Sequence, residues 1–280
     1  MTRRVSYRDH RIKPVLIIVF LAVAALTLLV AGGKAAKEPV PSVNPRSDVE
    51  SLCRVDIPDD VPEIWLRYEG FNVSFNPAHH QPNYSSWELT GEEVDGAGER
   101  KSNFRADKDV YGCATLADYR NSGYDRGHMA PAADMKWSTQ AMADCHYLTN
   151  ICPQDRKVNG GIWNTLENKC RAWAERDSAI IIICGPVLSD YMPKTIGQSQ
   201  VSVPTRFFKV VLAPFANPPR AVGFIIPNYP VDATLESMSM SVDDVEAATG
   251  FDFFSALPDD IENFVESRNS YGLMNVRSSR

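Results

Sequence analysis

The sequence predicts a single α+β domain, in which a central antiparallel sheet is flanked by helices, behind an N-terminal hydrophobic segment. Three apolar runs, 179–184, 207–212 and 221–226, are bounded by Gly and Pro and predict central strands. Residues 161–175 place apolar side chains at helical spacing and predict a helix just before the first of these strands. Because no internal repeat occurs, we expect one domain from about Cys53 to Leu273.

Shorter patterns predict the remaining elements. Two short strands are expected at 64–68 and 71–76, and the alternation at 87–90 predicts a half-buried strand. A polar loop is expected to precede Tyr84, the charged segment 92–109 is expected to be a loop, and 147–151 is interpreted as a strand. Ser241, with Asp244 three residues later, predicts a capped helix that ends near Gly250.

The net charge argues mildly against general binding to polyanions. The 280-residue chain has a formal charge of −6, and five of its cations but only one anion lie in residues 1–33. The rest of the chain is therefore more acidic than the total suggests. Any affinity for phosphate must come from a local basic site or from a bound cation.

The N-terminus predicts a membrane anchor or an export signal. Residues 15–32 contain no charge, and a helix of that length would span about 27 Å, close to the hydrocarbon core of a bilayer. The preceding basic segment, 1–14, is expected to stay in the cytoplasm. An uncleaved anchor is favoured over a cleaved signal peptide because the apolar run is long. Residues 33–50 are interpreted as a linker and 51–280 as the extracytoplasmic domain.

Six cysteines follow the linker, an even number that permits disulfides in an exported chain but does not define their pairing. Their spacing does not suggest zinc, because no CxxC pair occurs. Cys184 ends an apolar run and is expected to be a buried thiol.

Residues 124–171 hold the candidate catalytic groups. His128 is the natural general base because its ordinary pKa is near neutral, although a structural histidine is the common alternative. Glu167 and Arg171 have the spacing of a surface ion pair on a helix. Asn159, which precedes two glycines, would be an ordinary turn or cap residue if taken alone. It lies eight residues before Glu167, about 80° away on a regular helix.

The segment 125–131, DRGHMAP, resembles the signature of the DNA/RNA non-specific endonucleases, which are ββα-metal nucleases. The resemblance continues through YLTNICPQ at 147–154, NGGIW at 159–163, Glu167 and Arg171, and it spans about residues 64–262. It implies a ββα-metal fold and a metal-dependent endonuclease that cleaves DNA and RNA without sequence specificity.

The resemblance also implies roles for single residues. His128 would activate water, and Asn159 would be the direct protein ligand of a Mg²⁺ ion, with Mn²⁺ as an alternative ion. Glu167 would hold a water molecule of the metal, and Asn150 would orient His128 or its surroundings. The basic residues Arg126 and Arg171 would face phosphate. A further upstream arginine is expected near the phosphate, and Arg100 and Arg105 are both candidates.

Other interpretations receive less support from the sequence. The adjacent His79 and His80 lie in a polar loop and are more typical of solvent-facing residues than of metal ligands. A cysteine nucleophile at Cys145, beside His146, is disfavoured because neighbouring side chains on a strand point to opposite faces. Two alternatives remain for the whole chain: a nucleic-acid-binding protein that keeps the fold without strong activity, and a mitochondrial intermembrane-space nuclease.

Overall fold

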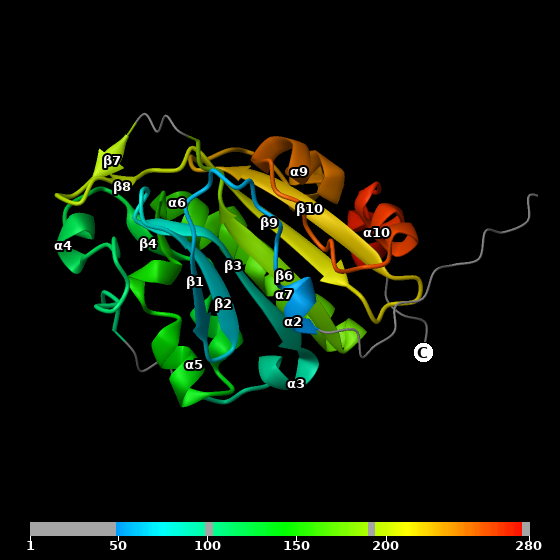
Figure 1. Cartoon of the computed structure of the whole chain (residues 1–280). Coiled ribbons are helices and arrows are strands. Elements are labelled where there is room, and N and C mark those ends of the chain that lie inside the picture. Colours follow the sequence, from blue (N-terminus) through cyan, green and yellow to red (C-terminus); the bar gives the residue numbers. More distant parts are fainter. Residues whose placement is uncertain (1–48, 99–102, 190–193, 276–280) are drawn as a thin grey trace, which may run out of the picture. The chain divides into compact units, whose positions relative to one another are not determined.

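The central element of the fold is a seven-stranded sheet in which all neighbouring strands are antiparallel (Figure 1). The structure is a computed structural model that describes residues 49–98, 103–189 and 194–275. The strands, in their order across the sheet, are β1 (Ile64–Tyr68), β2 (Phe71–Asn76), β3 (Gln81–Thr90), β6 (Ala179–Pro186), β9 (Arg206–Ala213), β10 (Arg220–Pro227) and β11 (Ser239–Met240).

The sheet is buried on both faces, which explains why its central strands are continuous apolar runs. In β6, Ile180 and Ile182 pack into one core cluster, whereas Ile181 and Ile183 pack into another on the opposite face. Successive side chains of a strand point to opposite faces, so both sets must be apolar when both faces are covered. The predicted central strands at 179–184, 207–212 and 221–226 are therefore confirmed.

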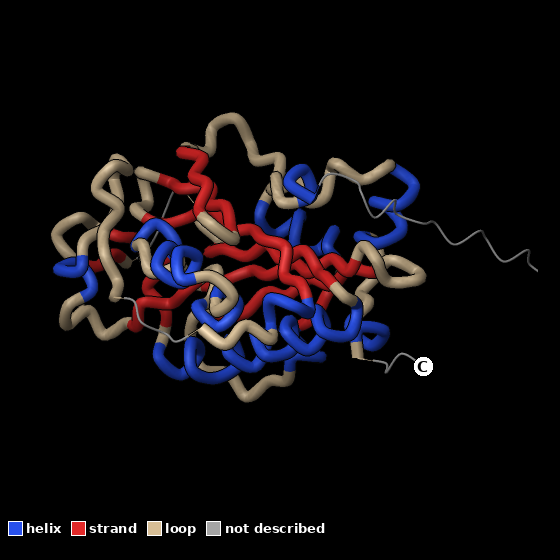
Figure 2. The backbone as a smooth tube through the Cα atoms, turned by 90° about the horizontal axis from the view of Figure 1, so that it is seen from below, coloured by secondary structure: helices blue, strands red, loops and turns tan. Residues whose placement is uncertain are grey.

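Helices cover each face of the sheet (Figures 1 and 2). One face carries α7, whose buried residues include Leu166, Cys170 and Trp173, and the other carries α9 and α10. The helices are α2 (Val49–Leu52), α3 (Gly91–Val94), α4 (Leu116–Tyr119), η1 (Ala132–Met135), α5 (Thr139–Asp144), η2 (Leu148–Asn150), α6 (Arg156–Val158), η3 (Asn159–Trp163), α7 (Asn164–Asp177), α8 (Leu235–Met238), α9 (Val242–Thr249), α10 (Asp259–Glu266) and α11 (Tyr271–Met274).

The predicted helix after Ser241 is confirmed together with its boundaries. The Ser241 side chain accepts from the backbone N–H of Asp244, whose carboxylate in turn accepts from Ser241. The helix ends at Gly250, which has a φ of 75°. Glycine meets that left-handed conformation without the steric cost of a Cβ atom.

A second, two-stranded sheet lies beside the central one and leads into α7. Strand β4 (Asp125–His128) pairs antiparallel with β5 (Ile151–Gln154), with His128 opposite Ile151. The chain then passes through α6 and η3 into α7. This β4–β5–α7 arrangement has the ββα order that the sequence resemblance implied. A third small sheet pairs β7 (Thr195–Ile196) with β8 (Val201–Ser202).

Three expectations about local structure are wrong. Residues 148–150 form a turn of 3₁₀ helix, so the strand predicted at 147–151 starts only at Ile151. Strand β3 begins at Gln81, inside the predicted polar loop, because its polar side chains are buried and hydrogen-bonded. A short helix, α3, interrupts the predicted loop after Thr90, which forms a capping box with Glu93.

The N-terminal segments predicted at 1–14 and 15–32 lie outside the described residues, as does the linker except for its last two positions, which begin α2. Within the ranges that the structure describes, no helix combines the length and hydrophobicity needed to cross a membrane. The same ranges contain no disulfide bond. Cys184 is fully buried, as expected.

Candidate active site

A wide pocket opens where β4, the loop after α4 and the start of α7 meet. Its volume is about 1130 Å³, larger than that of most small-molecule sites, which measure roughly 300–1,000 Å³. Four of the six predicted site residues line it: Arg126, His128, Asn159 and Glu167. The other lining residues are Phe104, Leu116, Tyr119, Arg120, Asn121, Ser122, Gly123, Tyr124, Asp125, Pro131, Ala132, Ala133, Arg156, Gly160 and Asn164.

The close pairing of β4 with β5 delivers His128 to the pocket. Gly127, one residue earlier, packs directly against the buried Gln154 of β5. A Cβ atom at position 127 would lie only 2.2 Å from the side-chain oxygen of Gln154. The glycine between Arg126 and His128 is therefore a packing requirement of the two-stranded sheet.

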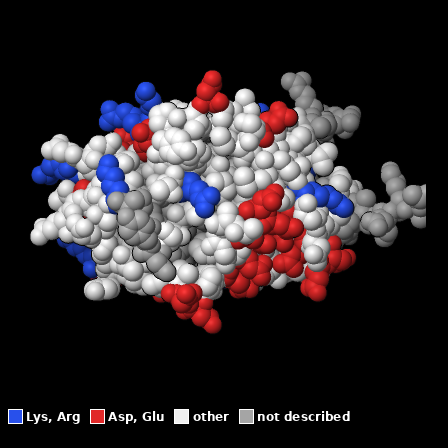
Figure 3. Space-filling model, turned by 90° about the horizontal axis from the view of Figure 1, so that it is seen from above, with Lys and Arg blue, Asp and Glu red and all other residues white. Residues whose placement is uncertain are grey.

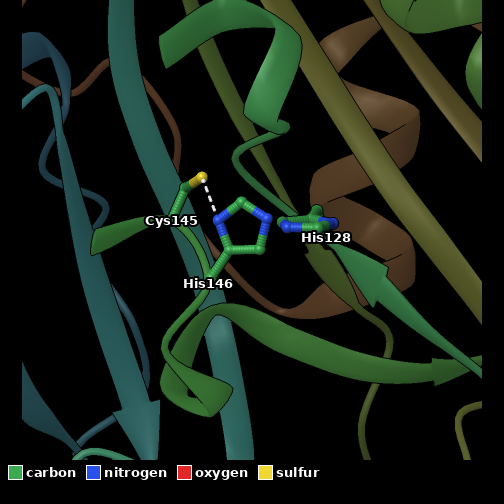
Figure 4. Close-up of side chains that lie close together, drawn as sticks. All are labelled: His128, Cys145 and His146. Carbon is green, nitrogen blue, oxygen red and sulfur yellow. Dashed lines mark hydrogen bonds between the residues drawn. The ribbon is translucent and has the colours of Figure 1, made fainter. Parts of the chain in front are cut away.

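The rings of Phe104 and His146 pack against His128, and Figure 4 shows that of His146. The centroids of Phe104 and His146 each lie 5.0 Å from that of His128, and His146 meets it edge-on at 89°. The guanidinium of Arg126 lies over the Phe104 ring, with its Cζ atom 4.4 Å from the ring centroid. These contacts restrict the orientation of the predicted base, and no local sequence pattern predicts them.

Cys145 and His146 do not lie on a strand, so the strand argument against a Cys145 nucleophile is wrong: Cys145 is the C-cap of α5, and His146 follows it. Their side chains contact each other at 3.3 Å, and Nδ1 of His146 is 2.8 Å from the carbonyl oxygen of Met142. A carbonyl only accepts, so Nδ1 carries a proton. Cys145 is fully buried and absent from the pocket lining, which gives a nucleophile no access to substrate.

The three side chains of His128, Cys145 and His146 do not converge on one point. Their candidate ligand atoms lie within 4.8 Å of one another. Figure 4, however, shows Cys145 and His128 on opposite sides of the His146 ring. We therefore interpret the group as packing around the base and not as a metal centre.

Asn150 lies behind His128 and uses both ends of its side-chain amide. Its oxygen accepts from the hydroxyl of Ser85 and the N–H of Ala130, at 2.8 and 3.0 Å. Its nitrogen donates to the carbonyls of Ala130 and Cys145, both at 2.9 Å. The residue is fully buried and does not line the pocket. It thereby holds the backbone two residues after His128, and its role in orienting the surroundings of His128 stays a prediction.

Asn159 opens a wide π turn, η3, that joins α6 to α7. The turn includes Gly161, whose φ of −108° and ψ of −112° are not helical. The side-chain nitrogen of Asn159 donates to Asp125 at 3.1 Å. Because a carboxylate only accepts, this bond defines which end of the amide is nitrogen and leaves the amide oxygen as the end available to a cation.

Glu167 lies close to two buried charged residues, Lys209 and Asp134. Burial raises the pKa of Glu167 to about 7, although the buried Lys209 nearby opposes the shift. The Nζ atom of Lys209 lies 4.5 Å from the ring centroid of Trp163. The neighbouring Asp134 is also buried. This environment disfavours a charged carboxylate more than water does.

Arg171 is held by Asp134 and does not line the pocket. Its guanidinium donates to Asp134 at 2.6 Å and to Asn168 at 2.7 Å. No ion pair joins it to Glu167 among the described residues, so the surface-pair alternative for these two positions is not formed. Arg171 therefore lies beside the site without being aimed into it.

The upstream arginine remains undefined. Arg100 is outside the described residues, and Arg105 is directed elsewhere, against Tyr147, Ala143 and Asp144. Two basic pocket residues that the sequence reasoning missed are Arg120 and Arg156.

The two histidines of the β2–β3 loop serve different local contacts. Nδ1 of His79 is 2.8 Å from the hydroxyl of Ser202, and Nδ1 of His80 is 2.7 Å from the carbonyl of Gly112. A shared metal site at these positions has no support in the described structure.

Comparison with known proteins agrees with this geometry. Residues 49–260 match the family model described as DNA/RNA non-specific endonuclease, so the chain belongs to that family of nucleases. It is 37% identical over 207 residues to "Nuclease EXOG, mitochondrial" of Danio rerio, covering 68% of this chain and 60% of that protein. It is 34% identical over 203 residues to "Endonuclease G, mitochondrial" of Homo sapiens, covering 66% of this chain and 67% of that protein.

The fold is also similar to that of a solved relative. The structure titled "Crystal structure of the EndoG/EndoGI complex: Mechanism of EndoG inhibition" matches with a TM-score of 0.66 and 26% sequence identity. The match covers 70% of this chain and 88% of that one. The chain spans only 57% to 60% of the length of the EXOG relatives that it matches.

The bonding of Asn150 generates a prediction about stability. Asn150→Ala would remove the partner of the Ala130 N–H and of the Ala130 carbonyl. It would also remove the acceptor of the Ser85 hydroxyl and the donor to the Cys145 carbonyl. We expect the free energy of unfolding to fall by roughly 3–5 kcal/mol, measured by urea denaturation. The exposed Asn263→Ala on α10 serves as the control and should change it by less than about 0.5 kcal/mol. A loss below about 1 kcal/mol for Asn150→Ala would refute its role as a clamp.

Proposed function

We propose that this protein is a metal-dependent endonuclease that hydrolyses phosphodiester bonds of DNA and RNA without sequence specificity. The observation that carries the proposal is the convergence of His128, Asn159 and Glu167 on one open pocket. The three come from a strand, a π turn and a helix, so they meet only through folding. Membership of the family adds independent support.

His128 is the proposed general base. A histidine of near-neutral pKa can take the proton of an attacking water at physiological pH. Packing against Phe104 and His146 limits the orientations of the His128 ring, so the ring is already positioned when the attacking water arrives. Asn150 supports the same geometry through the backbone.

The donor set fits Mg²⁺, which we propose is held directly by the amide oxygen of Asn159. Oxygen ligands suit this hard cation, which usually keeps several waters and takes few protein ligands. Asp125 positions the amide, and Glu167 is placed to accept a hydrogen bond from a water near the ion. When bound, the cation would supply positive charge opposite the developing negative charge of the phosphate.

Arginines near the pocket are proposed to bind the nucleic-acid backbone. Arg120, Arg126 and Arg156 line it, and contacts to phosphate carry no sequence information. Binding should therefore weaken with salt for every sequence alike. We propose that Arg171 acts indirectly, by holding Asp134 beneath the site.

A catalytically weak nucleic-acid-binding protein is the alternative from another class. It predicts that the full-length chain, purified in detergent, retards DNA in a gel but never shortens plasmid DNA or RNA with Mg²⁺ or Mn²⁺. The presence of all three groups in one pocket favours the enzyme.

His128→Ala tests the base. We expect kcat for plasmid cleavage to fall roughly 10²–10⁴-fold, while the melting temperature changes little. His79→Ala, a histidine remote from the pocket, should keep full activity. Full activity in His128→Ala would show that the base is another group.

Glu167→Gln should raise stability while lowering activity. Because the folded-state pKa of about 7 exceeds the ordinary 4.5, the carboxyl group destabilises the fold progressively as pH rises through that interval. At pH 8 in EDTA we expect the variant to be more stable by about 1–2 kcal/mol, with no gain at pH 4. Cleavage with Mg²⁺ should fall about 10–100-fold.

The matched control for that prediction is Glu175→Gln, on the exposed side of the same helix. It should change neither the stability nor the cleavage rate. Equal activity in Glu167→Gln and the wild type would remove Glu167 from the mechanism.

We propose an extracytoplasmic location for the domain, anchored to a membrane through residues 15–32, and probe it by fractionation. The support is the uncharged run and the basic residues that precede it. Recovery of the native chain with bacterial inner membranes, resistant to a high-salt wash, is expected. Recovery in a mitochondrial intermembrane-space fraction would favour the other route, and purely soluble full-length chain would contradict the anchor.

A further inference from the structure

An acidic cluster lies on the face of the sheet opposite α7, between helices α9 and α10. Three carboxylates face one another there: Asp243 and Glu246 from α9, and Glu266 from the last turn of α10. One oxygen from each lies within 4.8 Å of the others. Figure 3 shows a dense group of acidic side chains on the side of the molecule that carries these helices.

Glu266 distinguishes this cluster from an ordinary acidic surface. The residue is only 5% exposed, and its buried Oε1 atom has no hydrogen-bond partner. Burial, together with repulsion from neighbouring acids including Glu246, raises the pKa of Glu266 to about 9. It also ends a helix, where the negative end of the dipole further disfavours an anion.

Within the described part of the chain, no basic side chain forms an ion pair with this cluster. None of the ion pairs formed by described residues involves Asp243, Glu246 or Glu266. The carboxylate of Glu246 is held in place, because its Oε1 atom accepts from the backbone N–H of Phe253 at 2.9 Å. The buried, unpartnered carboxyl of Glu266, beside two other acids, is stabilised either by a bound proton or by a bound cation.

We propose that Asp243, Glu246 and Glu266 form a Ca²⁺ site that joins α9 to α10. Calcium binds oxygen at about 2.3–2.6 Å, so oxygens on opposite sides of one ion can be up to about 4.6–5.2 Å apart, and three oxygens within 4.8 Å of one another can therefore reach the same ion. Zinc prefers nitrogen and sulfur, and Mg²⁺ demands a tighter octahedron at about 2.0–2.1 Å. The site is separate from the pocket, so its effect would be on stability.

Thermal melting of the full-length chain tests the proposal. Asn159→Ala is introduced throughout so that the catalytic metal ligand cannot contribute. If Kd is about 10⁻⁴–10⁻³ M, 10 mM CaCl₂ should raise the melting temperature by roughly 3–8 °C relative to NaCl of equal ionic strength. Glu266→Gln should abolish that rise, whereas the exposed Glu236→Gln on α8 should retain it.

Equilibrium dialysis with radioactive calcium provides a second measurement. We expect one ion per chain in the Asn159→Ala protein and none after the further change Glu266→Gln. If the latter variant does not fold, the surface change Asp243→Asn should instead weaken calcium binding at least tenfold. An unchanged response in a folded cluster variant, or an equal effect of NaCl, would overturn the proposal.

Discussion

The site depends on one buried side chain that never reaches substrate. Asn150 joins three parts of the chain that are distant in sequence: Ser85 on the central sheet, Ala130 after β4, and Cys145 at the end of α5. Water does not reach these buried groups, so each of them would be left without a partner if the amide moved. Few other positions of the Asn150 side chain would satisfy all of them. Through the N–H and carbonyl of Ala130, this constraint acts on the backbone two residues after His128.

The sequence predicted the framework well where both faces of an element are apolar or a cap is explicit. Strands β6, β9 and β10 and helix α9 were found with nearly correct boundaries. The prediction failed where polar residues are buried, as in the first half of β3. Gln81 is satisfied by Ser202, far along the chain, and Asn83 by Asn76 and Pro62 in other segments, and no local pattern announces these partners.

The same distinction applies to the site. The residues His128, Asn159, Glu167 and Arg126 could be predicted because their chemical types and spacing match a family pattern, and all four line the pocket. The packing of Phe104 and His146 against His128 is a contact between distant segments and has no local pattern. The position of Arg171 was also beyond the sequence, since it depends on where the buried Asp134 lies.

The wide turn at Asn159 makes the site sensitive to chain length. Gly161, inside this turn, has backbone angles that are not helical, so the chain is kinked between Asn159 and Glu167. The offset of about 80° that eight residues of regular helix would place between the two side chains therefore does not apply. Loss of one residue from the kinked segment would change the direction of Asn159 relative to Glu167 even if every other residue were kept.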